Sequence, residues 1–264
     1  MKVTTDLKLI IYINQDIFSY TIFNTNKNCF EEINQYNLLR NQKNLSEEIL
    51  KTIESNSILS KNYSKILCAV DFETSTFIPI ELFNKNNINH YINDNNQENK
   101  IEYIKQQFID CYTLFTIPKN ILEILETKYN NIHIKPFASI IVDYAMHIHN
   151  KNDSQILTQV NKNNFHITFV NNGQFIFYNK FNFESTDDFL YYFMNCLHIL
   201  EIDGKKTNTF VITELDNKLE LFQKLSKYLQ ILFLEKPSNF LYKNQILEYE
   251  TYKNHKLFSQ LICE

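Results

Sequence analysis

The pattern of hydrophobic and polar positions in the first half of the chain predicts a meander of three strands, then a mixture of helices and strands. β-rich runs cover 7–14 and 17–24, and a more polar run covers 29–38, with short polar stretches between them. Such spacing is typical of antiparallel strands joined by tight turns. The elements expected after the meander are a helix over 46–58, strands over 65–70, 76–83, 111–117 and 132–136, and helices over 118–129 and 137–150.

The second half of the chain repeats this order. The expected elements are strands over 155–161, 165–171 and 174–183, a helix over 184–203, a strand over 208–213, a helix over 216–229 and a strand over 230–235. A repeat of more than roughly 100 residues predicts two similar lobes rather than a solenoid. We expect an N-terminal lobe over 1–152, with a polar loop at 84–100, and a C-terminal lobe over 153–264, each with a mixed sheet and helices.

Serine and aspartate residues mark the starts of two predicted helices. Ser46 is expected to cap the helix over 46–58. Ser185 and Asp188 have the spacing of a capping box, and Asp187 and Asp188 also suit the positive end of a helix dipole. Asp187 and Asp188 can be read as a catalytic carboxylate pair, but helix capping explains both without any chemistry.

Gly173, one of two glycines in the chain, lies between two β-rich runs. Asn172 and Gly173 tolerate the positive φ angles that a tight hairpin turn requires. A phosphate-binding loop of the Walker type needs several glycines and a Lys-Ser or Lys-Thr pair, and a dinucleotide fingerprint needs three glycines. We therefore interpret Gly173 as a turn residue.

Charge and composition exclude several classes of partner. The net charge is −4, Arg40 is the one arginine, and the lysines are scattered, so we expect no nucleic-acid surface. No apolar run reaches 18 residues and no secretory signal is recognisable, so we expect no membrane span. Five widely spaced cysteines without a signal peptide predict reduced thiols and a cytoplasmic protein.

The histidines and cysteines predict neither a metal site nor a catalytic site. His147 and His149 are two residues apart on a predicted helix and so point to different faces, whereas a zinc pair on a helix is four residues apart. Cys196 stands beside His198, but it falls on the apolar face of its helix and is expected to be an inert core thiol. No catalytic residue and no metal ligand is therefore assigned.

The duplicated order resembles the actin-like ATPase architecture of sugar kinases, actin and heat-shock chaperones. Four stretches, 17–24, 76–83, 164–193 and 261–264, resemble more closely a bacterial family known as domain of unknown function 3822. The most specific of them is the Asn-Phe segment followed by Ser-Thr-Asp-Asp-Phe-Leu-Tyr-Tyr. The resemblance implies an α/β protein with a duplicated actin-like ATPase (ribonuclease H-like) fold, and it implies no activity.

The ATPase motifs of the resembling proteins are incomplete in this chain. Active members carry Asp-x-Gly in the first hairpin of each lobe, where the Asp holds magnesium and the Gly lets amides approach phosphate. Asp16 is present in the first hairpin, but Phe18 stands where the glycine is needed, and the hairpin at 160–166 has neither acid nor glycine. The Gly-Gly adenosine motif is also absent. Asp16 is the one candidate for cofactor binding, and no cofactor is expected.

These observations favour a non-catalytic binding or scaffolding module that acts through the inter-lobe cleft or an exposed sheet edge. Its protein partner is unidentified, and nucleotide, nucleic acid and membrane are not expected as partners. One alternative is a divergent ATPase or small-molecule kinase that uses Asp16 and the inter-lobe cleft. A nucleic-acid-associated factor is a third class, and the absence of clustered arginine argues against it.

Overall fold

The computed structural model of the 264-residue chain describes residues 4–38, 45–72, 74–92, 96–149, 153–216, 219–248 and 252–264. Arg40 and residues 150–152, where the lobe boundary was expected, lie outside the described residues. The chain forms two compact units. Unit 1 comprises Met1–Ile140, Pro237–Tyr249 and Ser259–Glu264, and unit 2 comprises Ile141–Lys236 and Glu250–Phe258. The end of the chain contributes segments to both units.

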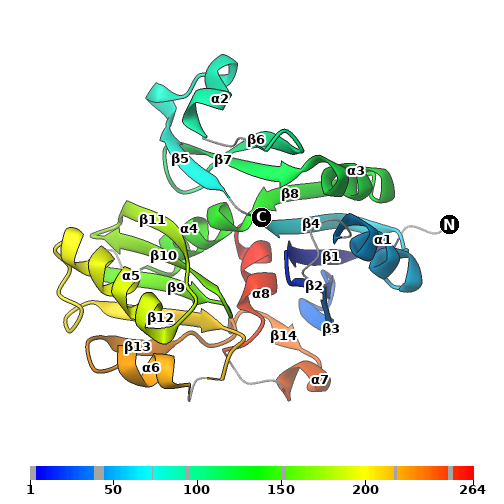
Figure 1. The fold of residues 1–264 in the computed structure, drawn as a ribbon. Coiled ribbons are helices and arrows are strands. Elements are labelled where there is room, and N and C mark those ends of the chain that lie inside the picture. The colour runs from blue at the N-terminus through cyan, green and yellow to red at the C-terminus, as the bar shows by residue number, and fades with distance from the viewer. Residues whose placement is uncertain are drawn as a thin grey trace. The chain divides into compact units, whose positions relative to one another are not determined.

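Unit 1 contains a six-stranded sheet with the order β14-β3-β2-β1-β4-β8 (Figure 1). Its strands are β1 (Thr4–Asn14), β2 (Ile17–Asn24), β3 (Cys29–Asn37), β4 (Tyr63–Asp71), β8 (Ile132–Pro136) and β14 (Leu241–Tyr242). The first three form the antiparallel meander that the sequence predicts. β4 then pairs parallel with β1, and β8 pairs parallel with β4.

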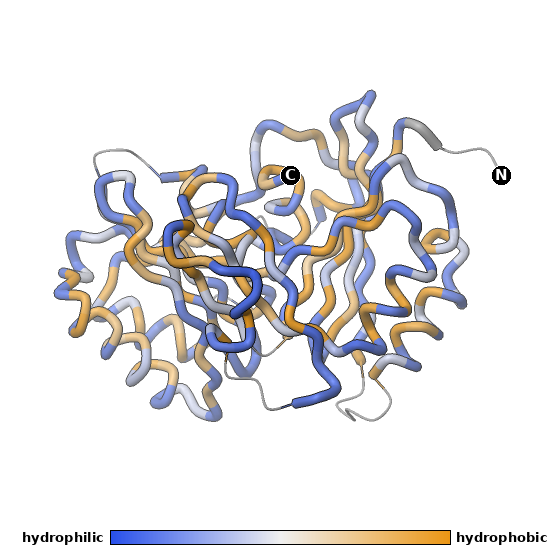
Figure 2. The backbone as a smooth tube through the Cα atoms, turned by 90° about the horizontal axis from the view of Figure 1, so that it is seen from above, coloured by the Kyte–Doolittle hydropathy of each residue, from blue (hydrophilic) through white to orange (hydrophobic). Residues whose placement is uncertain are grey.

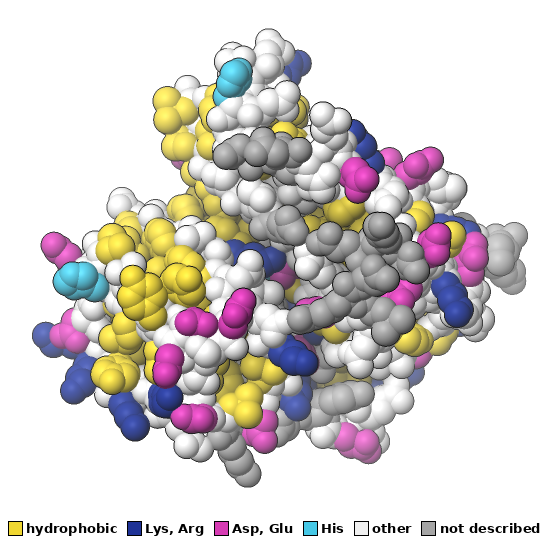
Figure 3. Space-filling model, viewed as in Figure 1, with side chains coloured by type: hydrophobic (Ala, Val, Ile, Leu, Met, Phe, Trp, Pro, Cys, Tyr) yellow, Lys and Arg dark blue, Asp and Glu magenta, His cyan; other side chains and the backbone are white. Residues whose placement is uncertain are grey.

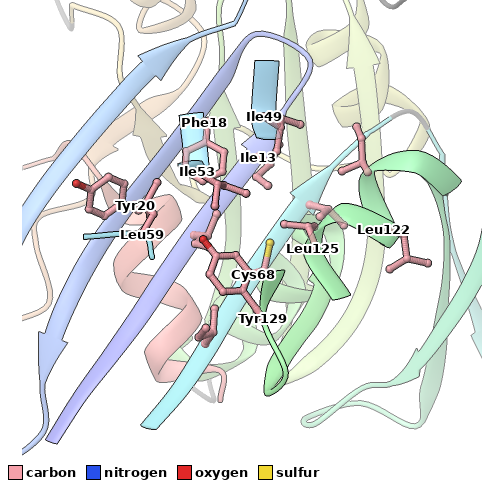
Figure 4. Close-up of a cluster of buried hydrophobic side chains, with 14 of the residues drawn as sticks. Ile13, Phe18, Tyr20, Ile49, Ile53, Leu59, Cys68, Leu122, Leu125 and Tyr129 are labelled. Atoms are coloured by element: carbon pink, nitrogen blue, oxygen red, sulfur yellow. The ribbon is translucent and has the colours of Figure 1, made fainter. Parts of the chain in front are cut away.

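Helices α1 (Leu45–Ser55) and α3 (Lys119–Lys128) cover one face of this sheet. Their apolar residues pack on side chains from β1, β2 and β4, as the close-up in Figure 4 shows. On the opposite face of β1, the ring of Tyr12 contacts the ring of Phe137 edge-on at 5.4 Å between centroids. Phe137 begins α4 (Phe137–Ile148). Alternate residues of β1 are therefore buried on both faces, which explains its nearly continuous apolar run.

Unit 2 contains a five-stranded sheet with the order β11-β10-β9-β12-β13. Its strands are β9 (Ser154–Val160), β10 (Asn164–Asn171), β11 (Gln174–Asn182), β12 (Asn208–Thr213) and β13 (Gln230–Phe233), and its helices include α5 (Thr186–Ile199) and α6 (Glu220–Leu225). This order repeats β3-β2-β1-β4-β8 of unit 1, with the same parallel and antiparallel pairings. The predicted duplication is therefore confirmed at the level of sheet topology.

A three-stranded antiparallel sheet with the order β5-β7-β6 also belongs to unit 1. It consists of β5 (Ser75–Pro79), β6 (Asn99–Lys105) and β7 (Cys111–Pro118). The segment 84–100 is not simply the polar loop that was expected, because it forms η3 (Lys85–Asn87), α2 (Ile88–Tyr91) and the start of β6. A short 3₁₀ helix, η2 (Ile80–Leu82), precedes this segment. The ring of Phe83 stacks on that of Tyr112 at 4.1 Å, which holds this polar segment on the small sheet.

The end of the chain adds β14, α7 (Asn244–Leu247) and α8 (His255–Ile262). The rings of Phe23 and Phe30 contact the ring of Phe240 at 5.5 and 5.3 Å, beside the pairing of β14 with β3. Figure 2 shows hydrophobic and hydrophilic residues alternating along the helices. This is the pattern expected of helices that cover a sheet with one face only.

The predicted turn at Gly173 and the predicted capping box are confirmed. Asn172 and Gly173 have φ angles of 47° and 80°, and they form the two-residue link between β10 and β11. Ser185 Oγ accepts a hydrogen bond from the amide of Asp188 at 3.1 Å, and Asp188 Oδ2 accepts one from the amide of Ser185 at 3.0 Å. The predicted cap at Ser46 is wrong, because α1 already includes Leu45 and Ser46 lies in its first turn.

Candidate functional site

The turn between β1 and β2 is the place where the actin-like resemblance implies a phosphate-binding loop. In the structure, Asn14 Oδ1 accepts hydrogen bonds from the backbone nitrogens of Asp16 and Ile17, both at 2.8 Å. Asn14 is 7% exposed, so this side chain is fixed in the protein interior. In a glycine-containing phosphate loop, backbone amides at such a turn are available to bind phosphate. In this turn, the amides of Asp16 and Ile17 already donate to Asn14.

Phe18 and Asp16 have different surroundings. Phe18 is fully buried in the hydrophobic core on the α1 side of the sheet, so its ring has a structural role that a glycine would not fill. Asp16 is partly exposed in the turn, and its carbonyl oxygen accepts a hydrogen bond from the amide of Leu38 at 2.7 Å. The candidate Asp16 therefore lies at the carboxyl end of β1, where ligands bind in open α/β sheets.

A buried polar cluster that the sequence analysis missed lies beside this turn. Asp71 ends β4, pairs in register with Asn14, and is 6% exposed. Tyr12, which is fully buried, donates a hydrogen bond from its hydroxyl to Asp71 Oδ2 at 2.8 Å, and Asn14 Nδ2 donates to the same hydroxyl at 3.4 Å. In the sequence, Asp71 is a single acid at the end of the apolar run of β4. Its hydrogen-bond partners cannot be predicted from that position.

A small cavity of about 90 Å³ lies near this end of the sheet in unit 1. Gln15, Phe72, Thr116 and Asn120 are among the residues that line it, and Asn120 Nδ2 donates a hydrogen bond to Ser46 Oγ at 3.0 Å. Pockets for small-molecule ligands usually measure about 300–1,000 Å³. This cavity is therefore smaller than a typical nucleotide site.

The matching turn of unit 2, between β9 and β10, is closed by its own asparagines. The amide of Asn161 donates to the carbonyl of Asn164 at 2.9 Å, and Asn161 Nδ2 donates to Asn164 Oδ1 at 2.8 Å. Gln159 Nε2 donates in turn to Asn161 Oδ1 at 3.2 Å. Side chains in this turn therefore bond to one another, as Asn14 bonds to the turn in unit 1.

A second polar cluster that the sequence analysis missed follows β12 in unit 2. Glu214 Oε1 accepts a hydrogen bond from the amide of Asn254 at 2.9 Å, and it lies 3.6 Å from Lys256 Nζ. Lys256 is only 2% exposed, and burial lowers the pKa of its ammonium group while Glu214 opposes that change. This ion pair, buried at Lys256 and partly exposed at Glu214, links the start of α8 to the loop after β12.

The remaining candidates lie in the core, in an exposed ion pair or just after a helix. Cys196 is 5% exposed and lies in the core of unit 2 as expected, and burial raises the pKa of its thiol to about 11. Asp187 Oδ1 lies 3.0 Å from Lys224 Nζ, which makes an exposed ion pair. His149 falls just after the end of α4 rather than within a helix with His147, and its Nδ1 lies 2.9 Å from the carbonyl of Met146.

The described part of the chain contains neither a cluster of metal ligands nor a helix that could span a membrane. Among those residues, no group of three or more His, Cys, Asp or Glu side chains is placed to hold a metal ion. Within the same residues, no helix is both long and apolar enough to cross a membrane.

Comparison with known proteins shows what the chain is similar to. A family model described as "Protein of unknown function (DUF3822)" matches residues 2–232, and no curated protein matches. Among solved structures, the chain is similar to a Bacteroides thetaiotaomicron protein described as having an actin-like ATPase fold and unknown function. The TM-score is 0.83 and the identity 19%, over 99% of this chain and 97% of that chain.

The chain is also similar to a protein of the PilM–PilN type IV pilus biogenesis complex, with a TM-score of 0.62 and 9% identity over 97% of this chain and 94% of that chain. At these identities, both likenesses show a shared fold, which is the duplicated actin-like ATPase fold implied by the sequence. Because the family model spans most of the sequence, the chain belongs to the family described as protein of unknown function DUF3822.

Proposed function

We propose that this chain is a non-catalytic binding module in which an actin-like fold is kept for its shape rather than for nucleotide chemistry. The observation that carries the proposal is the hydrogen bonding of Asn14 Oδ1 to the amides of Asp16 and Ile17. A phosphate would have to displace the buried Asn14 side chain before it could reach these donors. Leaving buried polar groups unpaired costs about 1–3 kcal/mol each, so the displacement opposes binding.

Three further features support the proposal. The turn between β9 and β10 is also closed by its own side chains, through Asn161 and Asn164. Phe18 is committed to the core of unit 1. Neither hairpin has the glycine through which backbone approaches phosphate in the active proteins that the chain resembles.

The proposed ligand is another polypeptide. The PilM–PilN structure describes a protein of similar fold as part of a protein complex, and this motivates the same proposal here. All five cysteines are free thiols, in keeping with the cytoplasmic location that we propose. A negative net charge and a single arginine argue against nucleic acid as the ligand.

A second candidate function, a divergent ATPase or small-molecule kinase, is favoured by one observation. Asp16 and the buried Asp71 lie at the same carboxyl edge of the sheet, because β1 and β4 pair in register there. Carboxylates in such a position can hold magnesium. This candidate requires that Asp16 contributes to nucleotide binding.

Thermal unfolding with and without millimolar Mg-ATP separates the two functions. A ligand present at a hundredfold excess over its Kd stabilises the native state by about 2.7 kcal/mol, which is readily seen as a higher melting temperature. We expect no shift for the wild type and none for Asp16→Ala. A clear rise in the melting temperature of the wild type with Mg-ATP, absent in Asp16→Ala, would contradict the binding module and favour the divergent ATPase.

A further inference from the structure

A groove of about 360 Å³ runs between the three-stranded sheet and the six-stranded sheet of unit 1. Its lining comes from β6, β7, α3 and β8. Phe115, Ile117 and Leu122 form a buried apolar floor, and the half-buried Ile132 and Ile134 form one wall. Its volume falls within the range of about 300–1,000 Å³ that ligand pockets usually have, so it is large enough for a few side chains.

Both walls of the groove are edge strands. β6 is one edge of the sheet β5-β7-β6, and β8 is one edge of the six-stranded sheet. In the part of the chain that the structure describes, no further strand pairs with β6 beyond β7 or with β8 beyond β4. An edge strand offers backbone N–H and C=O groups to another extended chain. The groove therefore combines an apolar floor with backbone donors and acceptors along its walls.

The side chains of β8 suit the addition of a strand. Ile132 and Ile134 face the groove, and on the alternate position Lys135 points away, since its Nζ donates to the carbonyl of Cys263 at 2.6 Å. The Lys135 side chain is thus occupied and does not block the edge. Pro136 ends β8, so pairing would stop there for lack of an N–H group.

The charges at the groove favour a basic residue in the ligand. Glu102 and Glu126 line the groove, and Lys100 Nζ lies 2.5 Å from Glu102 Oε1. Hydrogen bonding to Glu102 raises the pKa of Lys100, and the charge of Glu126 adds to that rise. Two carboxylates therefore lie near one ammonium group, which leaves a field that attracts a further positive charge.

We propose that this groove binds an extended segment of a partner polypeptide, which pairs as an added strand with β8 and packs alternate apolar side chains against the half-buried Ile132 and Ile134. This mode is β-strand addition, in which backbone hydrogen bonds supply affinity and side-chain pockets supply specificity. The ligand carries a Lys or Arg near Glu102 and Glu126. The proposal rests on the proposed function as a protein-binding module and gives that module its site.

The test uses the full chain and a displayed library of short randomised peptides. Peptides selected on the immobilised protein are synthesised, and their affinities are measured for the wild type, Ile134→Glu, Glu126→Lys and Ile176→Glu. Ile176 is the matched control, because it is a 45% exposed isoleucine on β11, an edge strand of the other unit. Circular dichroism and thermal unfolding establish that each variant is folded.

We expect selected peptides to alternate apolar residues and to carry a basic residue. Ile134→Glu should weaken binding by about tenfold or more, as loss of a central apolar contact does, and Glu126→Lys should weaken it less. Ile176→Glu should leave binding unchanged. Should Ile134→Glu fail to fold, hydrogen exchange of the wild type decides, since the bound peptide must slow exchange of the amides in 132–135.

Other outcomes overturn the groove proposal in distinguishable ways. If peptides bind Ile134→Glu and the wild type equally, or protect amides outside 132–135, the binding site lies elsewhere. The proposed function as a binding module is not contradicted by either result. A dimer that Ile134→Glu dissociates makes a second copy of the chain the occupant. Failure to select any peptide contradicts the groove, whereas only binding of Mg-ATP contradicts the proposed function.

Discussion

The side-chain oxygen of Asn14 lies 2.8 Å from the backbone nitrogen of Asp16, and it accepts a second hydrogen bond from the next amide along the turn. One residue thus closes the loop in which the resembling ATPases hold phosphate. Hydrophobic side chains are also exposed in the other unit. Figure 3 shows hydrophobic side chains gathered over α5, where Tyr191 is 66% exposed. Under the proposed function, mutations should change binding and stability.

Asn14→Ala should destabilise unit 1. The substitution removes the acceptor for the amides of Asp16 and Ile17, and each lost hydrogen bond costs about 0.5–1.5 kcal/mol, so a loss of about 1–3 kcal/mol is expected. Chemical denaturation measures the change. Asn26→Ala, at an exposed position in the next turn, is the control and should stay within about 0.5 kcal/mol of the wild type. Equal effects of the two substitutions would mean that the Asn14 bonds contribute nothing.

Two substitutions in and before α5 should lower the free energy of unfolding by different amounts. Ser185→Ala removes the cap and should cost about 1 kcal/mol. Phe193→Ala, at a fully buried position, should cost about 3–5 kcal/mol because it opens a cavity. Asn172→Ala in the hairpin turn should cost about 1 kcal/mol, because residue 172 also has a positive φ, which asparagine tolerates better than alanine. Denaturation midpoints rank the three, and unchanged midpoints for Ser185→Ala and Phe193→Ala would contradict the packing of this helix.

The capping box also predicts a pH dependence. Hydrogen bonds from Ser185 and from the amides of Glu184 and Ser185 lower the pKa of Asp188 below its ordinary value. A carboxyl group whose folded-state pKa is lowered stabilises the protein above its unfolded pKa, and this contribution is lost as the pH falls through the folded pKa. Asp188→Asn should therefore narrow the stability difference between neutral pH and about pH 3. If Asp188→Asn and the wild type lose stability in parallel on acidification, the carboxylate is not responsible.

His255 should make unit 2 sensitive to mild acid. Burial lowers the pKa of His255 to about 4, and Lys236 adds to that effect. The unfolded chain takes up a proton near pH 6.5 and the folded one near pH 4, so stability falls as the pH drops through this interval. The loss approaches about 3 kcal/mol at about 1.4 kcal/mol per pKa unit. Denaturation at stepped pH should show a flatter profile for His255→Gln, while the exposed His90→Gln should follow the wild type.

Tyr129 and Tyr63 provide a matched pair of buried tyrosines. Tyr129 is 5% exposed and its hydroxyl has no hydrogen-bond partner among the described residues, whereas the Tyr63 hydroxyl donates to the carbonyl of Ile58 at 2.8 Å. Burial raises the pKa of both phenols. Tyr129→Phe should be neutral or stabilising by about 1 kcal/mol, and Tyr63→Phe should destabilise by a similar amount. Denaturation measures both, and a clear loss of stability in Tyr129→Phe would show that its hydroxyl has a partner.

Much of the fold could be predicted because the two meanders have strong alternating or continuous apolar patterns. β6 could not, because its exposed lysines and half-buried apolar residues lie at a sheet edge and resemble the polar segment before it. β14 could not either, since a strand of two residues carries no periodicity and forms only where Phe240 packs on Phe23 and Phe30.

The candidate site was predictable only in part. Asp16 and the missing glycine could be read directly from the first hairpin, but the role of Asn14 depends on the local geometry of the turn. Asp71 and Tyr12 meet because β1 and β4 pair in register across many residues of intervening chain. The groove beside β8 depends on the same kind of long-range placement, which local patterns do not encode.

Residue-resolved hydrogen exchange of the β1–β2 turn, measured with and without Mg-ATP, tests the central claim most directly. If Asn14 holds the amides of Asp16 and Ile17, both should exchange slowly in the wild type and faster in Asn14→Ala, and Mg-ATP should change neither rate. Slowed exchange of these two amides on addition of Mg-ATP would mean that the turn binds phosphate, and the account of a non-catalytic module would be wrong.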